Sequence, residues 1–201
     1  KQPEPFLLET VTEQLVDTQG TVIRQRQGFV NRLNERLREF YPVFSGGTEH
    51  LKIQYRTFVD TERNLETQMK DLYRKTRERD LRFSVTGDGI HKDDLVFLLN
   101  GYPMSAVGSQ GQKRSALLAL KLSLCSIIQE KTGQYPVFLL DDVFSELDPV
   151  RRQKLIDLIP QNMQVFITAA EPVQADFGNR MVCVHHIKKE INGKDKQNES
   201  Q

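Results

Sequence analysis

The sequence has no tryptophan and only two cysteines, Cys125 and Cys183. Two cysteines cannot form the set of disulfide bridges that holds small secreted domains together, so a reducing, cytoplasmic setting is expected. Each cysteine lies in an apolar run, which favours a small buried side chain over a reactive thiol. Cysteine usage therefore argues against a disulfide-stabilised extracellular module.

Long apolar runs and an excess of charge of one sign are also missing. No run approaches the roughly 20 residues that a membrane-spanning helix needs, so no membrane association is expected. No signal peptide opens the chain, and a first residue of Lys1 rather than methionine favours a processed or excised piece. The 28 Lys and Arg residues balance 27 Asp and Glu residues, and a net charge of +1 still permits a local basic face that binds nucleic acid.

Residues 5–41 predict one long amphipathic helix. Their apolar side chains recur mostly at three- and four-residue steps, which is the spacing of one helical face. Gly20 and Gly28 weaken the interior and are candidate breaks. Pro42 and the following Ser45-Gly46-Gly47 are expected to end the helix.

The next segment, residues 51–80, predicts a strand followed by a second helix. Alternating apolar residues over 51–58 indicate a short strand. Residues 59–80 are very polar, with a narrow apolar stripe that indicates a helix. Two helices separated by a short strand favour a projecting helical arm over residues 1–80.

After about residue 80 the pattern becomes that of a sheet packed against helices. Asn100-Gly101 is a strong hairpin signal, residues 111–131 form a helix apolar enough to be buried, and Asp148 caps a further helix. The expected strands are 83–85, 95–99, 137–140, 165–167 and 181–184. We therefore expect an α/β lobe over 81–190 and a disordered polar tail over 191–201.

Two carboxylates follow the most apolar of these strands. Val137 to Leu140 reads as a central parallel strand, and Asp141 and Asp142 come directly after it. Ligands bind at this edge of α/β sheets. In nucleotide hydrolases the first carboxylate holds magnesium and a second orients or deprotonates the attacking water. The alternative is a strand that simply runs into an acidic turn.

A polar segment stands directly before the buried helix. Ser109, Gln110, Gly111 and Gln112 combine a hydroxyl, a glycine that allows close backbone approach and the free amides of a helix start. Together these groups make an anion site. The alternative is an ordinary polar helix cap, but the segments that follow favour the anion site. The order of this segment, the buried helix, the Asp141 strand and the loop from Ser145 to Asp148 resembles the signature, Walker B strand and D-loop of ABC-type ATPases.

The same segments resemble the RecF family of DNA-repair ATPases more narrowly, over about residues 1–188. The matching segments are Gly89-Ile90-His91-Lys92-Asp93-Asp94-Leu95, Asn100-Gly101, Ser109-Gln110-Gly111-Gln112-Lys113-Arg114 and the run from Leu139 to Asp148. The resemblance implies the carboxy-terminal lobe of an ABC-type ATPase with a mostly helical arm. It also implies ATP and Mg²⁺ as cofactors, an ATP-dependent homodimer on double-stranded DNA and gap junctions, and partnership with RecO and RecR in loading RecA.

Residue by residue, the resemblance assigns Asp141 to magnesium and Asp142 to catalysis. It assigns the segment from Ser109 to Gln112 to the γ-phosphate of the partner subunit's ATP, and Ser145 and Asp148 to the D-loop. Two departures stand out. No Gly-x-x-x-x-Gly-Lys-Ser/Thr loop occurs, so the chain alone is not expected to hold ATP. Ala169 replaces the switch histidine that many ABC proteins carry.

Charge patterns give two weaker candidate sites. Lys70, Arg74, Lys75 and Arg77 form a basic segment that either contacts DNA phosphates or is a solvated helix face. The set His91, Asp93 and Asp94 resembles a metal cluster, but neighbouring side chains on a strand point to opposite faces. Two alternative functions remain, namely an SMC-like structural ATPase and a non-enzymatic dimerisation or docking module.

Overall fold

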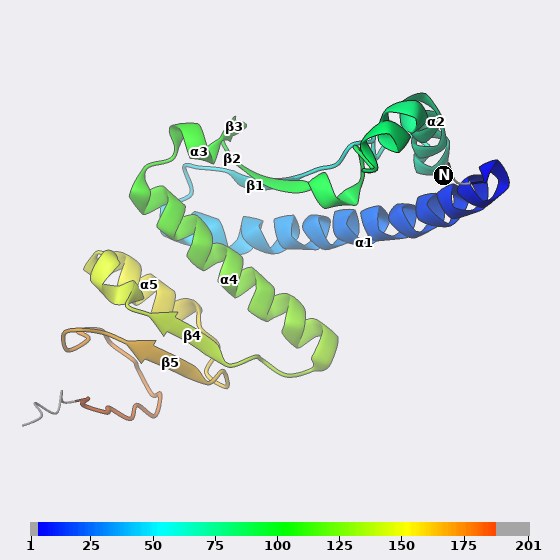
Figure 1. The fold of residues 1–201 in the computed structure, drawn as a ribbon. Helices are drawn as coiled ribbons and strands as arrows, with labels where there is room; N and C mark the ends of the chain where they lie inside the picture. Colours follow the sequence, from blue (N-terminus) through cyan, green and yellow to red (C-terminus); the bar gives the residue numbers. More distant parts are fainter. Residues whose placement is uncertain (1–3, 188–201) are drawn as a thin grey trace, which may run out of the picture.

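The structure, a computed structural model, describes residues 4–187. The tail expected over 191–201 lies outside the described residues. Figure 1 shows two regions, an upper arm built on α1 and a lower lobe in which a two-stranded sheet lies beside two helices. None of the described helices is long and apolar enough to cross a membrane.

The arm is built on one uninterrupted helix, α1 (Pro5–Ser45). Gly20 and Gly28 do not break it, and Pro42 lies inside it, so the expected breaks and the expected end at Pro42 were wrong. The helix ends instead at Gly46, whose φ of 72° is left-handed. A buried stripe with seven-residue spacing outweighs the roughly 1 kcal/mol cost of each glycine. The stripe consists of Val16, Ile23, Val30, Leu37 and Phe44.

An antiparallel sheet lies along α1 and consists of β1 (Leu51–Arg56), β2 (Asp94–Leu99) and β3 (Tyr102–Pro103). Alternate residues of β1 are buried, as the sequence predicted. The predicted hairpin is also confirmed, because Asn100 and Gly101 both have positive φ and connect β2 to β3. β1 pairs with β2, so the sheet joins residues from both sides of the boundary expected near residue 80.

The second arm helix, α2 (Leu65–Phe83), begins and ends later than predicted. Asn64 caps its start, with the side-chain Oδ1 accepting a hydrogen bond from the N–H of Thr67 at 2.7 Å. Phe83 is the last helical residue and Ser84 follows in a left-handed conformation. The strand predicted over 83–85 was therefore wrong, because the good helix formers before Phe83 extend α2 through it. A short 3₁₀ turn, η1 (Ile90–Lys92), leads into β2.

A short helix, α3 (Met104–Val107), follows β3 and packs against β2 and β3 (Figure 1). The lobe contains α4 (Gln110–Thr132), β4 (Phe138–Asp141), η2 (Val143–Glu146), α5 (Pro149–Leu158) and β5 (Val165–Thr168). β4 and β5 are parallel and are connected through α5, as in a βαβ unit. The strand predicted over 181–184 does not form, and residues 169–187 contain no helix or strand. Cys183 in this segment is exposed, which corrects its predicted burial, whereas Cys125 in α4 is buried as expected.

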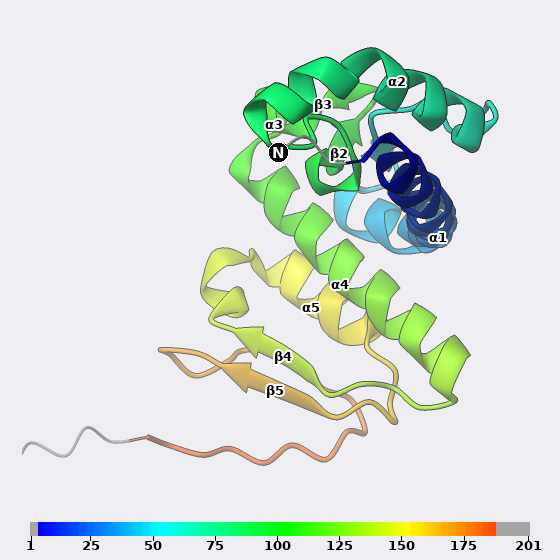
Figure 2. The same ribbon diagram turned by 45° about the vertical axis from the view of Figure 1, so that its right-hand side comes forward.

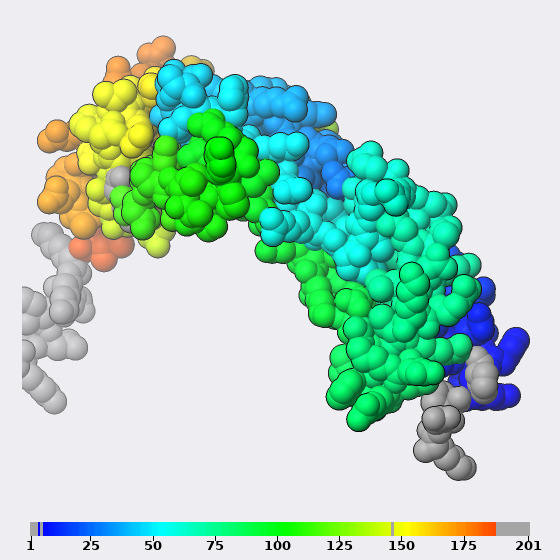
Figure 3. All heavy atoms as spheres, turned by 90° about the horizontal axis from the view of Figure 1, so that it is seen from above, coloured from blue at the N-terminus to red at the C-terminus, as the bar shows by residue number. Residues whose placement is uncertain are grey.

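Helix α4 crosses α1 near the end of α1 that is closer to the lobe, and α5 lies beside the β4–β5 sheet (Figures 1 and 2). From above, the molecule curves in an arc from the arm to the lobe (Figure 3). The predicted burial of α4 is confirmed for most of its apolar residues, whereas Leu117 is 52% exposed. One face of the β4–β5 sheet is apolar and is not covered by any of the described residues. On this face Leu139 is 62% exposed and Phe166 is 54% exposed.

Candidate nucleotide site

The edge of the two-stranded sheet places Asp141 and Asp142 around one hydroxyl group. Thr168, the register partner of Asp141, donates its hydroxyl to Asp141 Oδ1 at 2.5 Å. The same hydroxyl oxygen accepts the N–H of Asp142 at 3.0 Å. Because parallel strands β4 and β5 end together, the edge collects oxygen ligands, and both aspartates are exposed there.

Asp142 turns the chain sharply out of the sheet. Its φ of 47° and ψ of 22° are left-handed, a conformation that aspartate tolerates better than most residues. Its carbonyl oxygen accepts a hydrogen bond from the Ser145 hydroxyl at 2.8 Å, which ties the turn to η2. The two neighbouring aspartates therefore leave the strand in different backbone conformations, so each is free to take a separate role.

The start of α4 forms a closed capping box. Ser109 Oγ accepts the N–H of Gln112 at 3.2 Å, and the Ser109 N–H donates to Gln112 Oε1 at 2.7 Å. The first amides of the helix, those of Gln110 and Gly111, have no acceptor within the helix and lie at its positive end. Ser109 and Gln110 are exposed, so the cap also has the properties of an anion site.

The amide nitrogen of the Gln112 side chain reaches the base of the arm, which is the connection between α1 and β1. Its Nε2 donates to Glu49 Oε1 at 2.7 Å, and the Tyr41 hydroxyl donates to Glu49 Oε2 at 2.7 Å. Burial and the neighbouring Glu49 carboxylate raise the pKa of Tyr41 above its ordinary value, so its hydroxyl stays protonated. Sequence reasoning missed Glu49 because no local pattern links it to a residue 63 positions away.

The loop after β4 returns to the same helix start. Asp148 caps α5 by accepting the N–H of Arg151 at 3.0 Å, and the two side chains form an ion pair at 3.4 Å. Arg151 also lies over Gly111, where a Cβ atom would stand 3.1 Å from its Nη1. A glycine at this position therefore gives the guanidinium room beside the backbone. Arg151 of α5 therefore lies between Asp148 of the predicted D-loop and Gly111 of the predicted signature.

The sheet edge suits one kind of metal site. Among the described residues, no group of three or more histidine, cysteine or acidic side chains could enclose a metal ion. Asp141, Asp142 and the Thr168 hydroxyl are hard oxygen ligands, which magnesium prefers. Magnesium bound with nucleotides usually takes only one or two carboxylates and completes its shell with phosphate and water. The residues present therefore fit a nucleotide-bound Mg²⁺ and do not form a closed cage.

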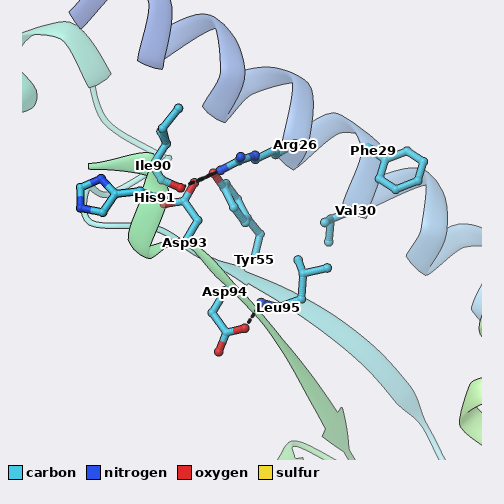
Figure 4. A pocket seen from close by; sticks show the side chains of 9 residues that line it. All are labelled: Arg26, Phe29, Val30, Tyr55, Ile90, His91, Asp93, Asp94 and Leu95. Atoms are coloured by element: carbon cyan, nitrogen blue, oxygen red, sulfur yellow. Dashed lines mark hydrogen bonds and ion pairs between the residues drawn. The ribbon is translucent and has the colours of Figure 1, made fainter. Parts of the chain in front are cut away.

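The candidate cluster of His91, Asp93 and Asp94 is a structural contact instead (Figure 4). Asp93 turns toward α1, where its Oδ2 accepts from Arg26 Nη1 at 2.6 Å and from the Tyr55 hydroxyl. Asp94 accepts the N–H of Leu95, and His91 points away from both carboxylates (Figure 4). Burial and the Asp93 carboxylate raise the pKa of Tyr55. Asp93 therefore ties α1 to the sheet through its bonds with Arg26 of α1 and Tyr55 of β1.

Three of the four predicted DNA-contacting residues line one groove between α1 and α2, namely Lys70, Arg74 and Arg77. Lys75 is exposed but is not among the residues that line it. Acidic side chains share the groove, and Lys70 lies 4.0 Å from Glu13. The acidic lining residues are Glu9, Glu13, Glu78 and Asp80. The groove therefore has mixed charge rather than a continuous basic surface.

The α/β lobe, the capped helix α4 and the aspartates after β4 give the chain the fold of the carboxy-terminal lobe of ABC-type ATPases, with a mostly helical arm. No protein-family model matches the chain. RecF, the DNA replication and repair protein, is 36% identical in Bacillus pumilus over 173 residues, which is 84% of this chain and 47% of that protein. In Listeria innocua RecF is 34% identical over 194 residues, 94% of this chain and 52% of the relative.

Two solved structures of the recombination mediator protein RecF in the RecFOR pathway have the same fold. The one described as RecF-ATP gives a TM-score of 0.74, and RecF-ATPrS gives 0.72. Each is 34% identical and covers 88% of this chain and 48% of the solved chain. The chain spans about half the length of the curated relatives it matches. By sequence and by fold it corresponds to the carboxy-terminal portion of RecF.

Proposed function

We propose that this chain is the signature and Walker B part of an ATP-dependent DNA-binding protein of recombinational repair. The observation that carries the proposal is that one lobe contains both a helix with a capped, exposed start, at the signature position, and two aspartates at the edge of a parallel sheet. The likeness to the RecF-ATP structure supports it. Further polypeptide, outside these 201 residues, supplies the phosphate-binding loop.

Each site residue has a distinct role in this proposal. Asp141 holds Mg²⁺, which neutralises phosphate charge, and Asp142 orients the attacking water. Ser109 and the amides of Gln110 and Gly111 face the γ-phosphate of ATP held by a second subunit, and Gln112 closes their cap. Ser145 and Asp148, in the D-loop, place that loop between the two nucleotides. In this arrangement ATP bound by one subunit recruits the second, so dimerisation depends on ATP binding.

The proposed biological setting is DNA gap repair in the cytoplasm, with RecO and RecR as partners in loading RecA. The RecFOR pathway named for the solved relatives supports this setting. Lys70, Arg74, Lys75 and Arg77 are the candidate DNA contacts. The groove that three of them line also has acidic lining residues, which limit its attraction to phosphate. The alternative, a non-enzymatic docking module, is favoured for the isolated chain by the missing phosphate loop.

Asp142→Asn in the whole protein tests the enzymatic role. We expect the variant to bind ATP with unchanged affinity, because Asp141 remains, and to lose ATP turnover. Labelled-ATP dialysis and phosphate release measure the two quantities, with Asp157→Asn on the exposed side of α5 as the matched control.

The isolated 201-residue chain should not bind ATP in the micromolar range. Wild-type turnover by Asp142→Asn, or micromolar binding by the isolated chain, would contradict the proposal.

Ser109→Arg in the whole protein tests the trans arrangement. The arginine adds bulk where phosphate must approach within about 3 Å of the backbone. We expect monomer ATP affinity to stay nearly intact while ATP-dependent dimerisation and turnover stop. Light scattering follows dimerisation, and fluorescence follows ATP affinity. Loss of ATP affinity with normal dimerisation of the remaining bound protein would show that Ser109 does not act on a partner's nucleotide.

A further inference from the structure

We propose that Glu49 is a positioning residue that sets the geometry of the signature segment from the base of the arm. The inference rests on the proposed ATPase function and adds a residue to it from outside the ATPase motifs. Glu49 lies in the connection between α1 and β1, and its carboxylate accepts a hydrogen bond from the side chain of Gln112 in the signature.

The connection that carries Glu49 is fixed at both ends. Gly46 closes α1 by donating its N–H to the carbonyl oxygen of Pro42. At the other end, the His50 N–H donates to Asn100 Oδ1 at 2.8 Å, and the Asn100 N–H donates to the His50 carbonyl at 2.8 Å. Glu49 is therefore held between the end of α1 and the β2–β3 hairpin, so its carboxylate has a defined position.

The carboxylate determines which way the Gln112 amide faces. An ionised carboxylate only accepts hydrogen bonds, so Gln112 must present its NH₂ group to Glu49 Oε1. The amide oxygen then faces the Ser109 N–H, which is the bond that completes the capping box. Tyr41 occupies the second carboxylate oxygen and prevents Glu49 from turning away.

This orientation affects the hydroxyl of Ser109. With the box closed, Ser109 Oγ accepts the Gln112 N–H and its own hydrogen remains available for an anion. Without Glu49 the amide of Gln112 is free to turn, the box opens and the start of α4 loses its fixed backbone geometry. Displacements of about 1 Å at such a site reduce rates by about a hundredfold. The nucleotide held by the same subunit does not contact this segment, so its affinity should not change.

The test compares Glu49→Gln and Glu49→Ala in the whole protein, with Glu35→Ala on the exposed face of α1 as the control. Glu49→Gln keeps the shape of the side chain but can offer its own NH₂ group to Gln112, so the choice of amide orientation is lost. We expect turnover to fall by about ten- to a hundredfold in both variants, with ATP affinity within about twofold of wild type. Thermal unfolding of Glu49→Gln should match that of the wild type.

Mixing experiments distinguish a positioning role from general damage. Glu49→Ala supplies an intact Asp142, and Asp142→Asn supplies an intact signature, so an equimolar mixture should recover turnover that neither protein has alone. If Asp142→Asn is inactive and Glu49→Gln turns over ATP like the wild type, Glu49 has no positioning role. If the mixture turns over ATP no faster than Glu49→Ala does alone, the role in trans is overturned. Normal turnover by Asp142→Asn itself would instead refute the ATPase proposal.

Discussion

Asp142 combines a proposed catalytic role with an unusual backbone conformation at a single residue. Its left-handed conformation disfavours most side chains, whereas asparagine tolerates it nearly as well as aspartate. Asparagine therefore changes the charge without changing the turn, and alanine would change both. For this reason the loss of turnover expected for Asp142→Asn reports on the carboxylate alone.

The two cysteines should differ in reactivity although their sequence surroundings are similar. Cys125 is buried in α4, and burial raises the pKa of its thiol, whereas Cys183 is exposed with its Sγ 3.4 Å from His185 Nε2. We expect a thiol reagent such as DTNB to label Cys183 rapidly in the folded chain and Cys125 only in denaturant. Cys183→Ser should remove the fast phase. Two fast thiols would show that α4 is not packed as described.

At the scale of elements, local signals were predictable and tertiary effects were not. The alternation in β1 and the Asn100-Gly101 hairpin follow from neighbouring residues, and both are confirmed. The uninterrupted course of α1 through Gly20 depends on burial of its seven-residue stripe, which single-residue propensities do not contain. The apolar residues around Phe83 predict a strand when they are considered alone. The helix that precedes them extends through Phe83 instead.

The same division applies to the candidate site. Asp141 and Asp142 were placed at a sheet edge from the apolar run before them, and the structure has them there. Thr168 could have been found as well, since two parallel strands of equal length end at the same edge. Glu49 could not, because its contact with Gln112 requires the α1–β1 connection to lie against α4.

The pairing of α1 with α2 should depend on pH. The Arg24 guanidinium, 2.7 Å from Glu66, holds the pKa of that carboxyl below its ordinary value. A depressed pKa adds stability above the unfolded-state pKa of about 4.3, and this stability is lost as pH falls through the lower folded-state pKa. The pair is solvent-exposed, so we expect less than about 1 kcal/mol.

Urea unfolding at pH 7 and pH 3 measures this contribution. Glu66→Gln should lower stability at pH 7 and have little effect at pH 3, whereas Glu62→Gln in the preceding turn serves as the control. An equal effect of Glu66→Gln at both pH values would show that the ion pair does not contribute.

At the scale of the whole molecule, one face of the β4–β5 sheet is open. Parallel sheets are normally covered on both faces, but Leu139 and Phe166 are more than half exposed. We expect the isolated chain to bind the dye ANS and to self-associate, and Phe166→Lys to reduce both. If additional polypeptide packs on this face in the whole protein, the same substitution should destabilise the fold there by about 2 kcal/mol or more.

Sedimentation and ANS fluorescence test the isolated chain, and urea unfolding tests the whole protein. Phe6→Lys is the matched control, because Phe6 is 80% exposed near the start of α1. Equal effects of the two substitutions in the whole protein would show that the sheet face stays uncovered.

The unbroken course of α1 makes the arm a lever. From Pro5 to Tyr41 the helix extends about 54 Å at 1.5 Å per residue, so a 5° tilt about Tyr41 moves its far end by about 5 Å. Pro42 follows directly and has no N–H, which removes one rung of the hydrogen-bond ladder at this pivot. A ligand that binds at the far end of α1 therefore acts on Tyr41 through a long lever arm. The Tyr41 hydroxyl donates a hydrogen bond to Glu49. A displacement at the far end of α1 therefore reaches the proposed signature through the hydrogen bonds that connect Tyr41, Glu49 and Gln112.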